Sequence, residues 1–272
     1  MSRPNSRNHL DNAIRKVAGL DKAFVAARTI MADAVVTQML PDGAVKGGSA
    51  LKIRFGDAAT RFSDDLDTAR LSSIERYADG LSEALRAGWE GFTGTLVRKE
   101  PRAPKEVPAQ YAMQPFEVKL SYLGKSWVTV RLEVGHNEIG DAEEPDMVVP
   151  EDAARLFKAL EFPELKPIPL MLIHHQIAQK LHGASEEGSG RAHDLVDLQL
   201  IERRGSVDYA KTRETCERLF SYRKKQSWPP VVVEGANWTS LYADAAEGLD
   251  VLRNVEDAVA WANDFIGRIA HS

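Results

Sequence analysis

The sequence predicts an α+β fold, with a mixed β-sheet in the first half of the chain and helices in the second. Residues 116–122 and 128–134 alternate apolar and polar side chains around a Leu-Gly-Lys turn, which predicts a β-hairpin with one buried face. After Pro150, apolar residues recur every three or four positions, which predicts a series of helices. The change of pattern predicts one domain over residues 1–145 and a helical domain over residues 146–272.

Other segments complete this expectation. Residues 10–39 have helical periodicity up to a Pro-Asp-Gly turn, and residues 92–97 predict a strand that joins the hairpin. Further strands are predicted over 44–46 and 62–68. Further helices are predicted over 49–55, 72–89, 151–160, 170–182, 193–203, 207–222 and 255–269.

The composition excludes several classes of protein. Among the 272 residues the one cysteine is Cys216, which excludes an internal disulfide and a cysteine-rich metal site. No stretch of about 18 apolar residues predicts a transmembrane helix, and the N-terminus lacks the apolar core of a secretory signal. We therefore expect a cytoplasmic protein that does not interact with membranes.

The net charge of −5 argues against a protein that coats nucleic acid through bulk electrostatics. Two basic clusters lie within residues 98–105 and 203–225, and we expect them to be solvated surfaces. If an RNA is the substrate, its phosphates would bind at these clusters.

The segment 46–67, KGGSALKIRFGDAATRFSDDLD, begins with a turn suited to phosphate. Gly47, Gly48 and Ser49 precede a predicted helix, so their backbone N–H groups and the positive helix end would attract a phosphate. Arg61, just before the next predicted strand, would assist. The alternative is an ordinary glycine turn followed by an acidic loop.

Three polar residues follow in alternation. Ser63, Asp65 and Asp67 lie two positions apart on a predicted strand, so they would share one face. Two carboxylates at this spacing suit Mg²⁺, which prefers oxygen ligands and completes its shell with substrate phosphates. A pair of Mg²⁺ ions can activate a hydroxyl and stabilise a leaving pyrophosphate. The combination indicates an enzyme that acts on a nucleoside triphosphate (NTP).

A two-metal site usually has a third carboxylate. Glu133 is the first choice, because it lies near the end of a strand on the face opposite the apolar residues. Glu117 occupies the matching face of the partner strand and is the reserve. The alternative for each is a solvent-facing sheet residue.

A second group of polar residues lies within residues 177–201. Lys180 is on a predicted helix, and Arg191, Asp194 and Asp197 are spaced by three across the start of the next one. Taken alone, this spacing is more typical of a helix cap with salt bridges between packed helices.

Together, the two groups resemble one family, the AbiEii/AbiGii-type nucleotidyltransferase toxins of type IV toxin–antitoxin and abortive-infection systems. The family pattern Gly-Gly-Ser/Thr-x-Leu and then Arg-x-Ser-x-Asp-Leu-Asp is matched by residues 47–51 and 61–67. A Lys-Leu helix and an Arg-x-x-Asp-Leu-x-Asp-Leu helix are matched by residues 180–181 and 191–198. The matched motifs span residues 46–201, most of the chain.

The resemblance implies a DNA-polymerase-β-like nucleotidyltransferase fold whose helical C-terminal domain contributes site residues. It implies transfer of a nucleoside monophosphate from an NTP to an RNA, with tRNA as the first choice, and release of pyrophosphate. It also implies growth inhibition and a cognate antitoxin.

The resemblance assigns the triphosphate to Gly48 and Ser49, and Mg²⁺ to the two aspartates of the first motif. Lys180 would reach a triphosphate oxygen as a point charge. Asp194 would be the later catalytic carboxylate, orienting Lys180 or acting as a base, whereas Asp197 looks structural.

Two departures from the family pattern weaken inference about the substrate. His193 stands where the family often has Arg or Lys, and Thr68 where an aromatic or aliphatic residue is common. Two alternatives stay open: a nucleotidyltransferase that modifies a protein hydroxyl or a small molecule such as an aminoglycoside, and a non-catalytic NTP-binding module.

Overall fold

The computed structural model describes residues 2–63, 65–101 and 113–272, which form two compact units. The first unit contains Met1–Gly56, Ser63–Asn137 and Pro145–Leu170, and the second contains Asp57–Phe62, Glu138–Glu144 and Met171–Ser272. This division differs from the expected boundary after residue 145, because residues 146–148 and 168–170 pair with the sheet of the first unit.

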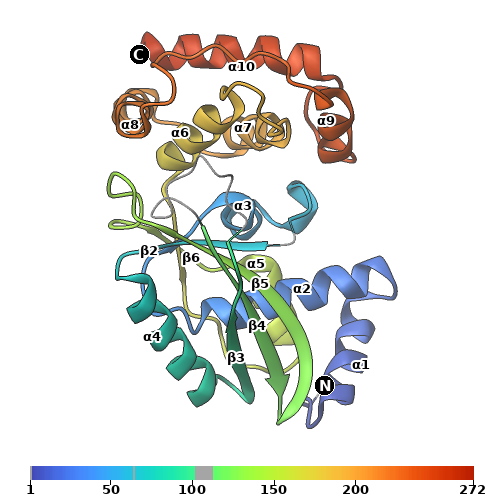
Figure 1. Ribbon diagram of the computed structural model, residues 1–272. Helices are drawn as coiled ribbons and strands as arrows, with labels where there is room; N and C mark the ends of the chain where they lie inside the picture. Colours follow the sequence, from blue (N-terminus) through green and yellow to red (C-terminus); the bar gives the residue numbers. More distant parts are fainter. Residues whose placement is uncertain (1, 64, 102–112) are drawn as a thin grey trace. The chain divides into compact units, whose positions relative to one another are not determined.

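One mixed sheet forms the centre of the first unit. Its strands are β1 (Ala44–Val45), β2 (Asp65–Arg70), β3 (Phe92–Arg98), β4 (Gln114–Tyr122), β5 (Lys125–His136), β6 (Asp146–Val148) and β7 (Ile168–Leu170). Within the described residues, these seven strands pair in the order β3-β4-β5-β2-β1-β7-β6 (Figure 1). The pairs β2–β5 and β1–β7 are parallel and the others are antiparallel. The predicted α+β class and the place of residues 92–97 in the sheet are confirmed.

The hairpin of β4 and β5 has the predicted buried face, with one correction. Val130, Leu132 and Val134 are buried, but Val128 is only half-buried and Trp127 is buried in its place. The register shifts between Leu120 and Ser121, so the alternation of β5 changes at this bulge.

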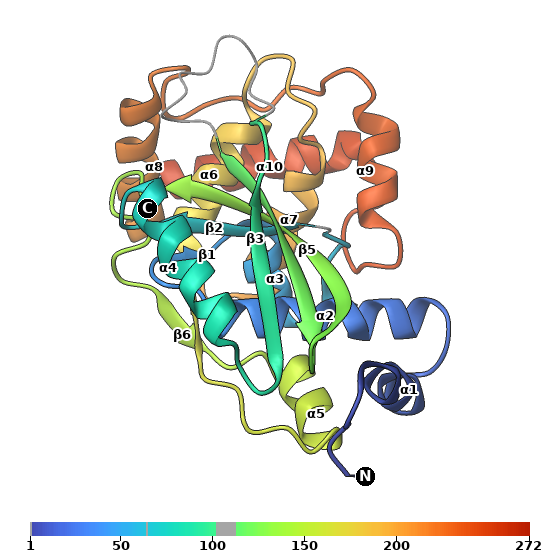
Figure 2. The same ribbon diagram turned by 60° about the horizontal axis from the view of Figure 1, so that its bottom comes forward.

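The expected single helix over residues 10–39 is two helices, α1 (Arg7–Ala18) and α2 (Lys22–Thr37). The chain leaves helical geometry between them, at Gly19 with φ of 103° and Asp21 with φ of 52°. These helices pack with α5 (Glu151–Ala159) beside the strands, while α4 (Ile74–Ala87) packs on β3 (Figure 2).

Strand β2 begins at Asp65, later than the expected start at residue 62. Ser63 therefore precedes the strand, and its expected place within the strand is wrong. Its hydroxyl instead donates to the carbonyl of Asp65 at 3.5 Å. Asp64 lies outside the described residues.

The second unit is helical. It contains α6 (Ile173–Ala184), α7 (His193–Arg204), α8 (Tyr209–Arg223), α9 (Trp238–Ala246) and α10 (Val255–Ala270). Helix α9 was not expected; Trp238 at its start is buried and donates its indole N–H to the carbonyl of Ser189 at 2.5 Å. In the described part of the chain, no helix is both long and apolar enough to cross a membrane.

At the turn before β1, the backbone of Gly43 lies close to the backbone of β2. Gly43 has φ of 85°, and a Cβ there would lie 1.9 Å from the carbonyl oxygen of Ala69. Gly43→Ala should lower the free energy of unfolding by about 3 kcal/mol, because left-handed strain adds to a backbone clash. Gly124→Ala is the matched control, since Gly124 has φ of 75° but no atom within 4 Å of an added Cβ. It should lose only about 1 kcal/mol in urea denaturation, and equal losses would contradict the proposed clash.

Candidate active site

A row of carboxylates lies on one face of the sheet in the first unit. Strands β2 and β5 are parallel, and their register places Asp67 directly beside Glu133. Asp65 lies two residues earlier on β2 and therefore points to the same face. Leu66 and Leu132 point to the opposite face and are buried in the core. The register thus places these three carboxylates on one face of two neighbouring strands.

Glu133 and Glu117 differ in their surroundings. Burial raises the pKa of Glu133, and the negative charge of Asp65 raises it further, while Lys46 lowers it. Glu117 pairs instead with the ammonium of Lys99 at 3.0 Å, and this hydrogen bond lowers its pKa. Glu133 is therefore in register with Asp67, whereas Glu117 forms an ion pair on the neighbouring strand.

The Gly-Gly-Ser turn opens α3 (Gly47–Phe55), which begins two residues earlier than expected. Gly47 has φ of 62°, and a Cβ there would lie 2.4 Å from a carboxylate oxygen of Asp67. Gly48 and Ser49 are buried in the first turn, and the hydroxyl of Ser49 donates to the carbonyl of Asp65 at 2.6 Å. No side chain of residue 46 caps the helix. The turn therefore holds the helix N-terminus next to the carboxylates.

The chemistry of this donor set fits Mg²⁺. The described residues contain no cluster of three or more His, Cys, Asp or Glu side chains converged as a metal cage. Mg²⁺ does not need one, since it binds through one or two carboxylates, water and substrate phosphates. Asp65 and Asp67 can supply those carboxylates, with Glu133 in register beside them.

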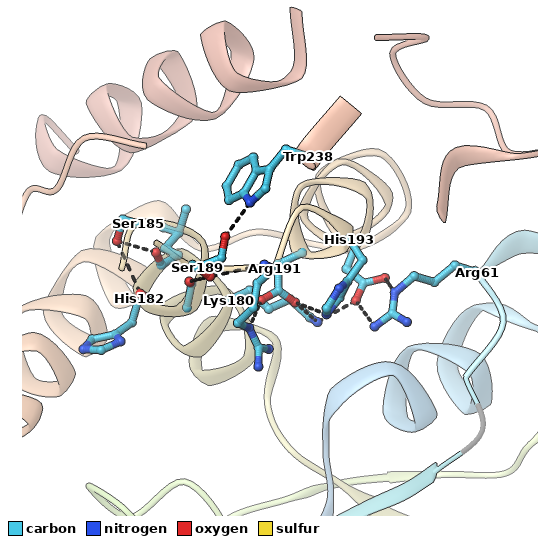
Figure 3. A network of polar contacts seen from close by, with 12 residues as sticks. Arg61, Lys180, His182, Ser185, Ser189, Arg191, His193 and Trp238 are labelled. Atoms are coloured by element: carbon cyan, nitrogen blue, oxygen red, sulfur yellow. Dashed lines mark hydrogen bonds and ion pairs between the residues drawn. The ribbon is translucent and has the colours of Figure 1, made fainter. Parts of the chain in front are cut away.

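The second unit holds a separate network of paired charges (Figure 3). The Lys180 ammonium on α6 donates to Asp194 at 3.1 Å and to Asp197 at 2.6 Å, both on α7. These three side chains are 5%, 0% and 1% exposed. Arg191 donates to the other oxygen of Asp194 at 2.6 Å. The spacing of three seen in the sequence therefore corresponds to a buried network around one lysine.

Arg61 belongs to this network, which its sequence position did not indicate. Its guanidinium donates through Nε and Nη2 to the two carboxylate oxygens of Asp197, both at 3.0 Å. Sequence reasoning assigned Arg61 to phosphate and left Asp197 without a partner. The two residues are 136 positions apart, so no local pattern could pair them.

Electrostatics distinguish the two roles considered for Asp194. Burial alone would raise its pKa, but the charges of Lys180 and Arg191 outweigh burial and hold the pKa well below its ordinary value. A carboxylate with so low a pKa is a poor proton acceptor near neutral pH. The neighbouring His193 has a lowered pKa because of burial, which the charge of Asp194 partly opposes. These surroundings favour an orienting role for Asp194 over that of a base.

The two basic clusters are partly neutralised. In the first, Lys99 pairs with Glu117, while Arg102 and Lys105 lie outside the described residues. In the second, four cations pair with carboxylates: Arg203 with Asp250, Arg213 with Glu217, Arg223 with Glu138 and Lys225 with Glu186.

Comparison with known proteins identifies the family. A model of the family described as "Nucleotidyl transferase AbiEii toxin, Type IV TA system" matches residues 29–265. The chain belongs to the AbiEii toxin family. It is therefore a nucleotidyltransferase, from a family that uses an NTP and a divalent metal. A search of curated proteins finds no match.

A search of solved structures finds matches that cover most of the chain. MenT4, a nucleotidyltransferase toxin from Mycobacterium tuberculosis H37Rv, is 16% identical with a TM-score of 0.51, covering 96% of this chain and 98% of that chain. JHP933 from Helicobacter pylori is 15% identical with a TM-score of 0.47, covering 93% of this chain and 94% of that chain. At this identity, the similarity to MenT4 shows the fold alone.

The buried network predicts a large effect of one substitution. Asp197→Asn removes the carboxylate shared by Arg61 and Lys180, so the buried Lys180 ammonium and the partly buried Arg61 guanidinium lose a counter-charge. The free energy of unfolding should fall by about 3 kcal/mol, measured by chemical denaturation. Asp250→Asn is the control, because Asp250 also pairs with an arginine but its side chain is 86% exposed. The control should lose less than about 1 kcal/mol, and similar losses in both variants would contradict the account of the network.

The AbiEii-family chain should also lose stability in mild acid through His182. This α6 residue is 2% exposed, neither ring nitrogen has a hydrogen-bond partner among the described residues, and burial, helped by Arg223, lowers its pKa to about 4. The unfolded chain binds a proton near pH 6.5, so stability falls as the pH drops from about 6.5 towards 4, by about 1.4 kcal/mol per pH unit.

The variant His182→Phe keeps a ring and removes the titration. Between pH 7 and pH 5, wild-type protein should lose roughly 2 kcal/mol more of its unfolding free energy than this variant. The control His271→Phe changes an exposed histidine near the C-terminus, and its loss should match wild type. Identical pH profiles for wild type and His182→Phe would refute the assignment.

Proposed function

We propose that this chain is a Mg²⁺-dependent nucleotidyltransferase toxin that transfers a nucleoside monophosphate from an NTP to an RNA acceptor. The first choice of acceptor is tRNA, the leaving group is pyrophosphate and the consequence is growth inhibition. The toxin acts in the cytoplasm and is neutralised by a cognate antitoxin. The observation that carries the proposal is the common face of Asp65, Asp67 and Glu133 beside the N-terminus of α3.

In the proposed reaction, the first unit binds the phosphates and the metal. Asp65 and Asp67 would hold Mg²⁺, with Glu133 as the third ligand. When bound, two Mg²⁺ ions supply charge neutralisation at the reacting phosphate and lower the pKa of the attacking hydroxyl. The backbone N–H groups at Gly47 and Gly48 open α3, where the helix dipole favours a phosphate.

The second unit would contribute Lys180. An ammonium has three N–H donors, and Asp194 and Asp197 accept two of them. The third remains for a triphosphate oxygen, so Lys180 can bind phosphate without leaving its counter-ions. Asp194 then acts as the orienting carboxylate, and Asp197 with Arg61 holds the network together.

The direct test incubates the protein with Mg²⁺, total RNA and each α-labelled NTP in turn. One NTP should label RNA, and EDTA should prevent it. Asp65→Asn should lower the rate by roughly a thousandfold or more, because it weakens the metal site. Lys180→Met should also abolish transfer and relieve growth arrest in cells. Asp79→Asn, an exposed carboxylate on α4, is the matched control and should retain full activity.

The same assay separates the alternatives. Label that survives RNase would place the acceptor on a protein or a small molecule. No transfer with any NTP, together with Mg²⁺-dependent NTP binding, would indicate a non-catalytic binding module. Undiminished toxicity of both Asp65→Asn and Lys180→Met would refute the assigned roles.

A further inference from the structure

Lys46 lies in line with the carboxylates, although its sequence position suggests only the end of a short strand. Its backbone N–H donates to the carbonyl of Asp67 at 2.9 Å, which extends the antiparallel pairing of Val45 with Thr68. Asp67 is in turn beside Glu133 on the other neighbouring strand. Lys46, Asp67 and Glu133 therefore form one row across β1, β2 and β5.

The Lys46 side chain reaches across this row to β5. A Cβ built at Gly135 would lie 2.8 Å from the Lys46 ammonium and 3.5 Å from its Cε. Gly135 does not have a positive φ, so its missing side chain matters for space and not for backbone conformation. It is two residues after Glu133 and shares its face. The glycine leaves the space that the ammonium occupies.

No hydrogen bond or ion pair joins the ammonium to another described residue, and the side chain is only half-buried. It is nevertheless close enough to Glu133 for its charge to stabilise the ionised carboxylate. A cation beside three carboxylates, without a salt bridge to any of them among the described residues, balances their charge. This differs from Lys180, whose ammonium is held by two aspartates.

We propose that Lys46 is a positioning residue that serves as a built-in cation of the carboxylate site. In the metal-free protein it offsets the repulsion among Asp65, Asp67 and Glu133. By the same charge it lowers the affinity of the site for a free divalent ion, so that the metal binds together with the NTP. The inference rests on the proposed function, because it takes these carboxylates as the metal ligands.

The expected sign follows from Coulomb's law. A divalent cation among the carboxylates is repelled by Lys46, so removal of the lysine charge should tighten metal binding. The triphosphate brings negative charge that offsets this repulsion. With nucleotide bound, removal of Lys46 should therefore matter less. If Lys46 had a purely structural role, its removal would damage the site and weaken metal binding.

The experiment measures Mn²⁺ binding to the full chain by electron paramagnetic resonance, with and without a non-hydrolysable NTP analogue. Lys46→Met keeps the side-chain length and removes the charge. Its Kd for Mn²⁺ without nucleotide should be roughly tenfold lower than that of wild type, and the gain should shrink when the analogue is present. The control Lys119→Met removes an exposed lysine on β4, on the same face of the sheet. It should leave the Kd unchanged within about twofold.

Thermal melting gives a second readout, which also applies if Lys46→Met is less stable than wild type. In EDTA, Lys46→Met should melt at a lower temperature than wild type, and Mn²⁺ should restore more of its stability than it adds to wild type. Lys46→Gln, which keeps a polar group without charge, should behave in the same way.

Equal or weaker Mn²⁺ affinity in both Lys46 variants would overturn the role of Lys46. Wild-type protein that binds no Mn²⁺ even with the nucleotide analogue would overturn the proposed metal site itself. The two failures are distinguishable, because the first is seen against a wild type that binds metal.

Discussion

Asp67 lies directly beside Glu133 because β2 and β5 run parallel in one fixed register. That register is held from the other face of the sheet, where Leu66 and Leu132 are buried in the core. A slip of one residue would move the carboxylates into the core and the leucines into solvent, so the hydrophobic core fixes the geometry of the charges. The price is like-charge repulsion at one face, which Lys46 and the N-terminus of α3 offset.

The two units handle charge in opposite ways. In the first, Asp65, Asp67 and Glu133 lie on one face of the sheet near Lys46, which forms no ion pair with them within the described residues. In the second, Lys180 is buried between Asp194 and Asp197, and Arg61 and Arg191 complete the set. A network of this kind fixes side-chain positions, because removal of either aspartate leaves the buried Lys180 ammonium with one counter-charge fewer.

Much of the fold follows from local patterns in the sequence. Alternation predicted β4 and β5, and the spacing of Asp65 and Asp67 predicted their common face. The bulge that buries Trp127 in place of Val128 has no local signal. The strands β6 and β7 were not predicted, since three residues each carry too little periodicity.

In the candidate site, the contacts that local sequence patterns cannot predict are those between residues far apart in the chain. Glu133 could be chosen from its place on a strand, but its position beside Asp67 depends on which strands are neighbours. The pairing of Arg61 with Asp197 depends on tertiary packing across 136 positions. The place of Lys46 could not be predicted from the sequence, because it depends on the antiparallel pairing of β1 with β2, which places Lys46 across from Asp67.

We propose that Asp65 and Asp67, with Glu133, bind the divalent metal of this AbiEii-family nucleotidyltransferase. Crystals grown with Mn²⁺ and a non-hydrolysable NTP analogue, measured at the manganese absorption edge, test it most directly. The account predicts anomalous density between these carboxylates and the phosphates of the analogue. Manganese bound at other residues, or nucleotide bound with no metal at this face, would contradict it.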